Sequence, residues 1–307
     1  MQSKRTSASA GTRETLPDPV IHEFAPLARE LLACESRPAL LQSARADALA
    51  KEIDDTIAKV EPSVLSFDVF DTLLLRNDAS EARRFLDISA RARKQVQRAF
   101  GKRGWPSEID FLLARVDAMA LCYRTRAAVE GCREGRIGDV IRVVRRALDL
   151  PAEAESVLLE AELDAEAESL TLNSVLIDVA RKFREQGGQV ILLSDMYLSK
   201  DEIVSLVRRL DPSSVEEIDH VFSSADHVVS KRSGKMFALV ERELQKAQFL
   251  HIGDALEGDV FQARKAGWSA LHFPIGRAEN ARRERDLAAF VAEMNDLGHD
   301  VSRWAKV

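Results

Sequence analysis

The spacing of apolar residues changes from one stretch of the chain to the next. In residues 19–60 apolar positions such as Leu49 and Ile53 recur at helical spacing, and Pro62 ends the predicted helix. We expect this stretch to be a helical extension that packs on the main domain, because a single amphipathic stripe does not fold alone. Residues 1–18 are rich in Ser, Thr and Ala, and we expect a flexible N-terminus there.

Residues 78–170 show helical spacing almost throughout. The pattern is interrupted near Gly101, Gly131 and Pro151, residues that end helices or begin turns. The predicted helices combine mixed charges with stripes of Leu, Val and Ala, as solvent-facing helices of a bundle do. This stretch is therefore predicted to be an inserted, all-helical subdomain of ordinary domain size.

Short apolar runs bounded by Gly, Ser or Asp indicate the strands. The first run begins at Val64 and leads into Asp68, and the others follow residue 171 with helical patterns between them. Strands that alternate with helices are typical of a parallel α/β sheet. Residues 61–77 and 171–307 are thus predicted to form a Rossmann-like core domain. The later strands are expected at residues 189–193, 220–223, 248–252 and 269–273.

Composition and charge argue against several classes of protein. The net charge is −6, whereas a general nucleic-acid binder would carry a basic excess. No apolar run has the length of a membrane span, and the first residues lack the apolar core of a secretory signal. Three cysteines, an odd number without paired metal-ligand spacing, indicate a reducing compartment. We expect a cytoplasmic protein with no membrane span and no nucleic-acid partner.

Polar side chains follow the predicted strands or open the helices after them. Asp68 follows the first strand, Ser194 the second, Lys231 precedes a helix, and Asp254 and Asp259 follow a third. The carboxyl ends of parallel strands face one edge of a sheet, so these groups are expected to meet in one crevice. A carboxylate nucleophile, a hydroxyl, an ammonium and a carboxylate pair suit phosphoryl transfer through an aspartyl-phosphate. Oxygen ligands of this kind suit Mg²⁺.

These motifs, in this order, resemble those of the haloacid dehalogenase-like (HAD) superfamily. The matching segments are residues 68–72, Ser194, Lys231 and residues 253–259. The resemblance covers residues 64–76 and 170–273, and it implies that the helical insertion is a cap over the active site. Two segments, residues 194–198 and 230–234, are also similar to a bacterial subgroup often found with surface-polysaccharide genes.

The resemblance also implies a role for each matching residue. Asp68 would be the nucleophile and a metal ligand, Phe70 would offer its backbone carbonyl to Mg²⁺, and Asp254 and Asp259 would complete the metal site. Lys231 would hold both the nucleophile and the phosphate. The residues expected to bind the substrate or its phosphate are Thr72, Ser194, Asp195 and Lys231.

One position departs from the family pattern. Family phosphatases carry an aspartate two residues after the nucleophile as general acid, and here that position is Phe70, followed by Asp71. A shift of one residue redirects a side chain, so Asp71 is open to two interpretations, a cap of the loop or a catalytic group. A good leaving group, an acid from the cap, or Asp71 itself would each compensate for the missing acid, whose loss costs about a hundredfold to ten-thousandfold in rate.

The predicted function is Mg²⁺-dependent hydrolysis of a phosphate ester through an aspartyl-phosphate on Asp68. The expected partner is a small phosphorylated metabolite such as a sugar phosphate, and residues 19–60 offer a surface for a protein partner. Two alternatives stay open. One is an enzyme of phosphoryl or carbon–phosphorus transfer that needs no acid at Phe70, and the other is a catalytically weak HAD-like scaffold in glycan assembly.

Overall fold

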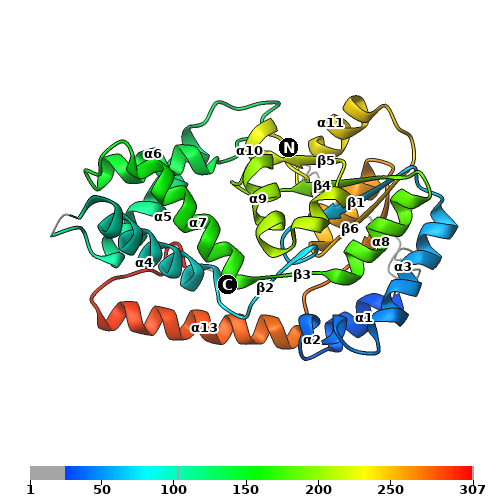
Figure 1. Ribbon diagram of the computed structural model, residues 1–307, viewed down its shortest axis with the longest axis horizontal. Helices are drawn as coiled ribbons and strands as arrows, with labels where there is room; N and C mark the ends of the chain where they lie inside the picture. Colours follow the sequence, from blue (N-terminus) through cyan, green and yellow to red (C-terminus); the bar gives the residue numbers. More distant parts are fainter. Residues whose placement is uncertain (1–24, 102–103, 306–307) are drawn as a thin grey trace, which may run out of the picture.

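The structure is a computed structural model that describes residues 25–101 and 104–305. Its centre is a five-stranded parallel sheet in the order β5-β4-β1-β6-β7 (Figure 1). The flexible N-terminus predicted for residues 1–18 and the first part of the predicted extension lie outside the described residues. The strands are β1 (Val64–Asp68), β4 (Gln189–Ser194), β5 (His220–Ser223), β6 (Phe249–Gly253) and β7 (Ser269–His272).

Strand β1 lies at the middle of the sheet and is buried over its whole length. Phe67 pairs with Leu192 of β4 on one side and with Ile252 of β6 on the other, so the three strands end at one edge. Successive side chains of a strand point to opposite faces of the sheet. Leu65 and Phe67 accordingly join one apolar cluster and Val64 joins another.

Helices cover both faces of this sheet. The cluster that holds Leu65 also holds side chains of α1 (Ala25–Ala33), α3 (Ala46–Val60), α8 (Ser174–Glu185) and α9 (Lys200–Leu210). On the opposite face, Phe237 and Val240 of α11 (Lys235–Leu244) pack with Trp268. The short elements of the core are α2 (Arg37–Leu41), the 3₁₀ helix Pro212–Glu217, α10 (Ser224–His227), the π-helix Leu256–Phe261 and α12 (Gln262–Lys265).

The inserted helical region, called the cap from here on, lies beside the sheet (Figure 1). Its helices are α4 (Glu81–Phe100), α5 (Glu108–Thr125), α6 (Ile137–Ala147) and α7 (Ala154–Ser169). The chain enters and leaves the cap through an antiparallel pair of short strands, β2 (Leu74–Arg76) and β3 (Leu170–Leu172). The apolar spacing did not predict this pair. It brings the two ends of the insertion together, just after the segment that follows β1.

The last helix, α13 (Arg277–Asp296), runs from the core to the underside of the cap (Figure 1). Phe290 and Met294 of this helix pack with Phe85 of α4 and Leu112 of α5. Residues 277–296, which the sequence analysis assigned to the core, therefore also support the cap. The predicted α/β core with an inserted helical region is confirmed, and of the helices in residues 25–101 and 104–305 none has the length and apolarity that a membrane span needs.

Candidate active site

Three carboxylates meet at the carboxyl edge of the sheet. Asp68 is the last residue of β1, Asp254 follows β6, and Asp259 lies in the π-helix that comes next. One oxygen of each lies within 4.8 Å of the others. Because β1 and β6 are neighbouring parallel strands, their ends bring these residues together as the sequence predicted.

Asp259 is held in place by its surroundings. Its Oδ2 accepts a hydrogen bond from the backbone N–H of Ala255 (2.9 Å), and its Oδ1 lies 3.1 Å from Nε2 of His251. Gly253 leaves room for this carboxylate, since a Cβ at that position would overlap the Asp259 side chain. Gly253, the last residue of β6, is thus needed for packing against Asp259, and Asp254, the next residue, is a candidate ligand.

Lys231 joins two of the carboxylates. Its Nζ contacts the carboxylate of Asp68 and lies 2.6 Å from Oδ1 of Asp259. Asp195 positions this lysine, because its carboxylate accepts the backbone N–H groups of Lys231 (2.7 Å) and Arg232 (3.0 Å). The contacts described for Asp195 therefore organise the loop that carries Lys231.

Burial and charge shift the pKa values of these groups in different directions. Burial, opposed by Lys231 and aided by Asp259, raises the pKa of Asp68 to about 7. Burial also raises the pKa of Asp254 well above its usual range, with the charge of Asp68 adding to it. Burial would lower the pKa of Lys231, but the carboxylates of Asp259 and Asp68 outweigh it and raise that pKa. The ionised ammonium of Lys231 is thus stabilised by carboxylates, whereas burial opposes the ionisation of Asp68 and Asp254.

The donor set fits a hard divalent cation. Three carboxylates and one ammonium leave two formal negative charges, and all the candidate ligand atoms are oxygens. Oxygen ligands of this kind suit Mg²⁺, Ca²⁺ or Mn²⁺ rather than Zn²⁺. A cation at this place would also favour the ionised forms of Asp68 and Asp254, whose pKa values burial raises.

Asp71 faces arginines rather than the carboxylate cluster. Its carboxylate lies 2.6 Å from Arg283 Nη2, 3.1 Å from Arg37 Nη2 and 3.4 Å from Arg76 Nη1. Burial would raise the pKa of Asp71, but the charges of Arg76, Arg283 and Arg37 outweigh it and hold the pKa well below its usual range. An ionised carboxylate has no proton to donate. Of the two interpretations of Asp71, this environment favours an anchor of the loop.

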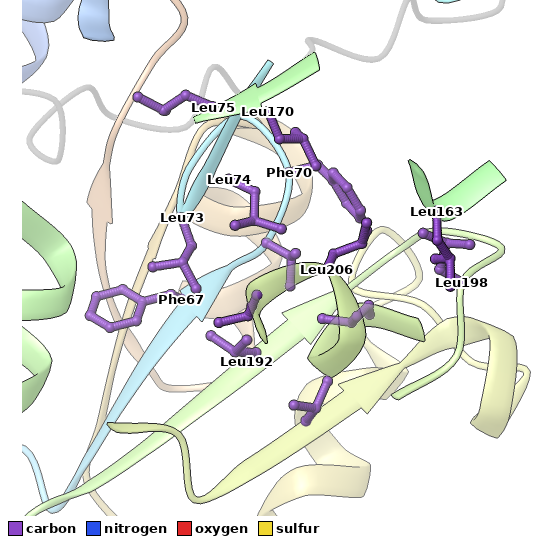
Figure 2. Packing of buried hydrophobic residues seen from close by; sticks show 14 of the residues in the cluster. Phe67, Phe70, Leu73, Leu74, Leu75, Leu163, Leu170, Leu192, Leu198 and Leu206 are labelled. Carbon is purple, nitrogen blue, oxygen red and sulfur yellow. The ribbon is translucent and has the colours of Figure 1, made fainter. Parts of the chain in front are cut away.

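Phe70 stands where the HAD-like pattern that the sequence resembles has its general acid, and its side chain is buried. Its ring belongs to an apolar cluster that also contains Leu170 and Leu206 (Figure 2). The guanidinium of Arg76 lies over the ring, 4.4 Å from its centroid. An apolar ring stacked on a cation therefore stands where the family pattern has a carboxylate.

All the predicted site residues except Thr72 line one pocket, which has a volume of about 250 Å³. Thr72 does not line it, but its side chain is buried and close enough to Asp68 to oppose the rise in the pKa of that carboxyl. Six lining residues were not predicted as site residues, although each lies in or near a predicted motif: Arg76, Met196, Arg232, Ala255, Glu257 and Gly258. The predicted lining residues are Asp68, Phe70, Asp71, Ser194, Asp195, Lys231, Asp254 and Asp259.

No protein-family model matches the sequence, and no curated protein does. Among solved structures, the chain is similar to a 2-haloacid dehalogenase from Pseudomonas syringae pv. Tomato DC3000, with 16% identity, 74% of this chain and 98% of that chain covered, and a TM-score of 0.47. It is also similar to the L-2-haloacid dehalogenase from Xanthobacter autotrophicus, with 20% identity, coverage of 76% and 88%, and a TM-score of 0.43. It is similar as well to a HAD family enzyme from Bacteroides thetaiotaomicron, with 14% identity, 68% of this chain and 91% of that chain covered, and a TM-score of 0.44. Similarities this low do not assign a function, so the function has to be inferred from the geometry of the site.

Proposed function

We propose that this protein is a Mg²⁺-dependent phosphohydrolase that forms an aspartyl-phosphate on Asp68. The observation that carries the proposal is the buried ion-pair cluster at the end of β1. There a single ammonium, that of Lys231, contacts the carboxylates of Asp68 and Asp259 in a pocket that Asp254 also lines. A nucleophile, a cation for the phosphoryl oxygens and a set of metal ligands are thereby present in one pocket.

In the first step an Oδ of Asp68 attacks the phosphorus of the substrate. The new bond joins this oxygen to phosphorus, and the bond from phosphorus to the leaving oxygen breaks with its electron pair remaining on that oxygen. Lys231 stabilises the charge on the transferring phosphoryl group, and Ser194 is positioned at the pocket to donate a hydrogen bond to it. Asp68, Asp254 and Asp259 would hold Mg²⁺, with the carbonyl of Phe70 as a further ligand, and the bound cation supplies charge neutralisation.

In the second step water attacks the phosphorus of the aspartyl-phosphate. The bond between phosphorus and Asp68 breaks, its electron pair returns to the carboxylate, and both protons of the water leave with dihydrogen phosphate. Phe70 favours a second candidate, a phosphotransferase, because transfer from a donor with a good leaving group needs no acid there.

Release of inorganic phosphate tests this function. Wild type and Asp68→Asn are assayed in parallel on acetyl phosphate and on p-nitrophenyl phosphate, with Mg²⁺ and with a chelator. We expect release that needs Mg²⁺ and falls by more than about a thousandfold in Asp68→Asn, because the nucleophile is lost. Asp201→Asn, an exposed helix-start carboxylate, is the matched control and should retain full activity. Equal activity of Asp68→Asn and wild type would contradict the mechanism, and products carrying the phosphoryl group on an added alcohol would favour the phosphotransferase.

A further inference from the structure

Arg76 is a pocket residue whose hydrogen-bonding capacity is mostly unused. It ends strand β2 and lines the same pocket as Asp68, and its side chain is 14% exposed. Its Nη2 faces Met196 Sδ (3.0 Å), a weak acceptor, and its Nε is buried with no partner in the described structure. Buried donors without acceptors are costly, so an arginine in this state suits a site where a ligand supplies the acceptors.

The one carboxylate paired with Arg76 is already shared. Asp71 Oδ2 lies 3.4 Å from Arg76 Nη1, whereas Asp71 Oδ1 lies 2.6 Å from Arg283 Nη2. Arg37 also contacts Asp71 at 3.1 Å. Three guanidinium groups thus surround one carboxylate, and Arg76 has the longest of the three contacts. Glu166 also acts on Arg76, but burial raises the pKa of Glu166 and so opposes its ionisation. Positive charge therefore remains available at the pocket wall on the side of Arg76.

The ring of Phe70 helps to position the guanidinium of Arg76. The guanidinium lies 4.4 Å from the centroid of the Phe70 ring, which stands at the position where the family pattern has the general acid. An arginine does not give up its proton in a protein, so Arg76 does not replace that acid as a proton donor. It stabilises an oxyanion instead, and a planar guanidinium fits two oxygens at once.

We propose that Arg76 receives the leaving group as an unprotonated oxyanion and that the substrate is therefore an acyl phosphate or a phosphoanhydride. This inference rests on the proposed function. As Asp68 bonds to phosphorus, the bond from phosphorus to the bridging oxygen breaks and its electron pair stays on that oxygen. The leaving group departs as a carboxylate or as a phosphate without taking a proton, and two of its oxygens face Arg76. A simple alkyl ester would have to release an alkoxide, and neither Phe70 nor the ionised Asp71 can protonate it.

Three probes and two arginine variants test the inference. Phosphate release in the presence of Mg²⁺ is measured with acetyl phosphate, with pyrophosphate and with glycerol 2-phosphate, for wild type, Arg76→Met and Arg84→Met. Arg84 is the matched control, because it is a buried arginine that donates to the Ala79 carbonyl (2.7 Å) and does not line the pocket. The readout is the ratio of kcat/KM on the better anhydride probe to that on glycerol 2-phosphate, which does not depend on the fraction of folded protein.

We expect wild type to prefer acetyl phosphate or pyrophosphate by more than about a hundredfold, since the ester needs an acid that is missing. Arg76→Met should lower kcat on the preferred probe by about a hundredfold and reduce this ratio, as the loss of an oxyanion donor does, whereas Arg84→Met should leave the ratio unchanged. The preferred probe distinguishes an acyl phosphate from a phosphoanhydride.

Two results would overturn the inference and leave the proposed function standing. One is turnover of glycerol 2-phosphate as efficient as that of the other probes, and the other is an equal ratio in Arg76→Met and Arg84→Met. In both cases release would still depend on Mg²⁺ and on Asp68. Absence of release from all three probes would instead contradict the proposed function itself, and the inference with it.

Discussion

Asp68 and Asp71 are three residues apart in the sequence, and their carboxylates lie in opposite electrostatic surroundings. Burial raises the pKa of Asp68, whereas the arginines around Asp71 overcome the effect of burial and lower its pKa. Environments that push two carboxyl pKa values apart separate their roles. At the scale of single residues, this contrast favours Asp68 as the reacting group and Asp71 as an anchor of the loop.

Glu166 allows a test of whether burial raises the pKa of a carboxyl group in this protein. It is 2% exposed, its Oε2 has no partner among the described residues, and burial raises its pKa above the usual value near 4.5. Below that pH both folded and unfolded states hold the proton. As the pH rises, the unfolded state ionises first, so the contribution of Glu166 to stability is lost as the pH passes through the folded-state pKa.

Glu166→Gln, which does not ionise, should therefore gain stability relative to wild type as the pH rises. Urea unfolding at about pH 4 and about pH 8 measures the difference in the free energy of unfolding. We expect this difference, variant minus wild type, to be more positive at the higher pH. A difference that is the same at both values, or that becomes more negative, would show that Glu166 is ionised in the folded protein at no cost.

At the scale of elements, the arginines around Asp71 connect three separate segments. Arg37 belongs to α2, Asp71 follows β1, and Arg283 belongs to α13. Arg37 also pairs with Glu279 of α13 at 2.7 Å. Asp71 itself has a φ of 62°, which places it in the left-handed region and reverses the chain toward β2. The network thus fixes the loop that follows Asp68 between the two ends of the described chain.

Asp71→Asn should be strongly destabilising, because it leaves buried guanidinium groups without their counter-charge. We expect a loss of about 3–5 kcal/mol in the free energy of unfolding, measured by urea titration. Asp178→Asn, which removes an exposed pair with Arg181, is the control and should cost less than about 1 kcal/mol. A loss for Asp71→Asn as small as that of the control would contradict the anchoring role.

The sequence predicted the elements that have a strong local pattern. The buried strand ending at Asp68 and the strand His220–Ser223 stand out because their apolar runs are bounded by polar residues. The strands Leu74–Arg76 and Leu170–Leu172 were missed, because three residues give no periodic signal and their pairing joins distant positions.

The residues of the candidate site also fall into those that the sequence predicted and those that it did not. The carboxylates and Lys231 were predicted because each follows a strand or precedes a helix, and the topology of the sheet then brings them together. The arginines around Asp71 were not predicted, because Arg37 and Arg283 lie 34 and 212 residues away from it. Contacts between such distant residues leave no local pattern. Arg76 was not predicted because it lies close to Asp68 and Asp71, whose carboxylates already suit the predicted chemistry.

At the scale of the whole molecule, the loop after β4 connects the pocket with the cap. The hydroxyl of Tyr197 lies 3.0 Å from Glu162 Oε1 and accepts a hydrogen bond from Arg115 Nη2 (2.9 Å), and both partners are cap residues. The backbone N–H of Ile137, at the start of α6, donates to the Tyr197 carbonyl (2.7 Å). The cap is therefore bonded to a loop whose neighbouring residues, Asp195 and Met196, line the pocket.

The most direct test of the account is to locate the phosphoryl group on the protein. Wild type is mixed with acetyl phosphate and Mg²⁺, quenched rapidly in acid, digested and analysed by mass spectrometry, with Asp68→Asn treated identically. We expect one added phosphoryl group on Asp68 of wild type, a smaller amount when Mg²⁺ is chelated, and none in the variant. Phosphate release by wild type with no phosphoryl group on Asp68 at any quench time, or with the group on another residue, would contradict it.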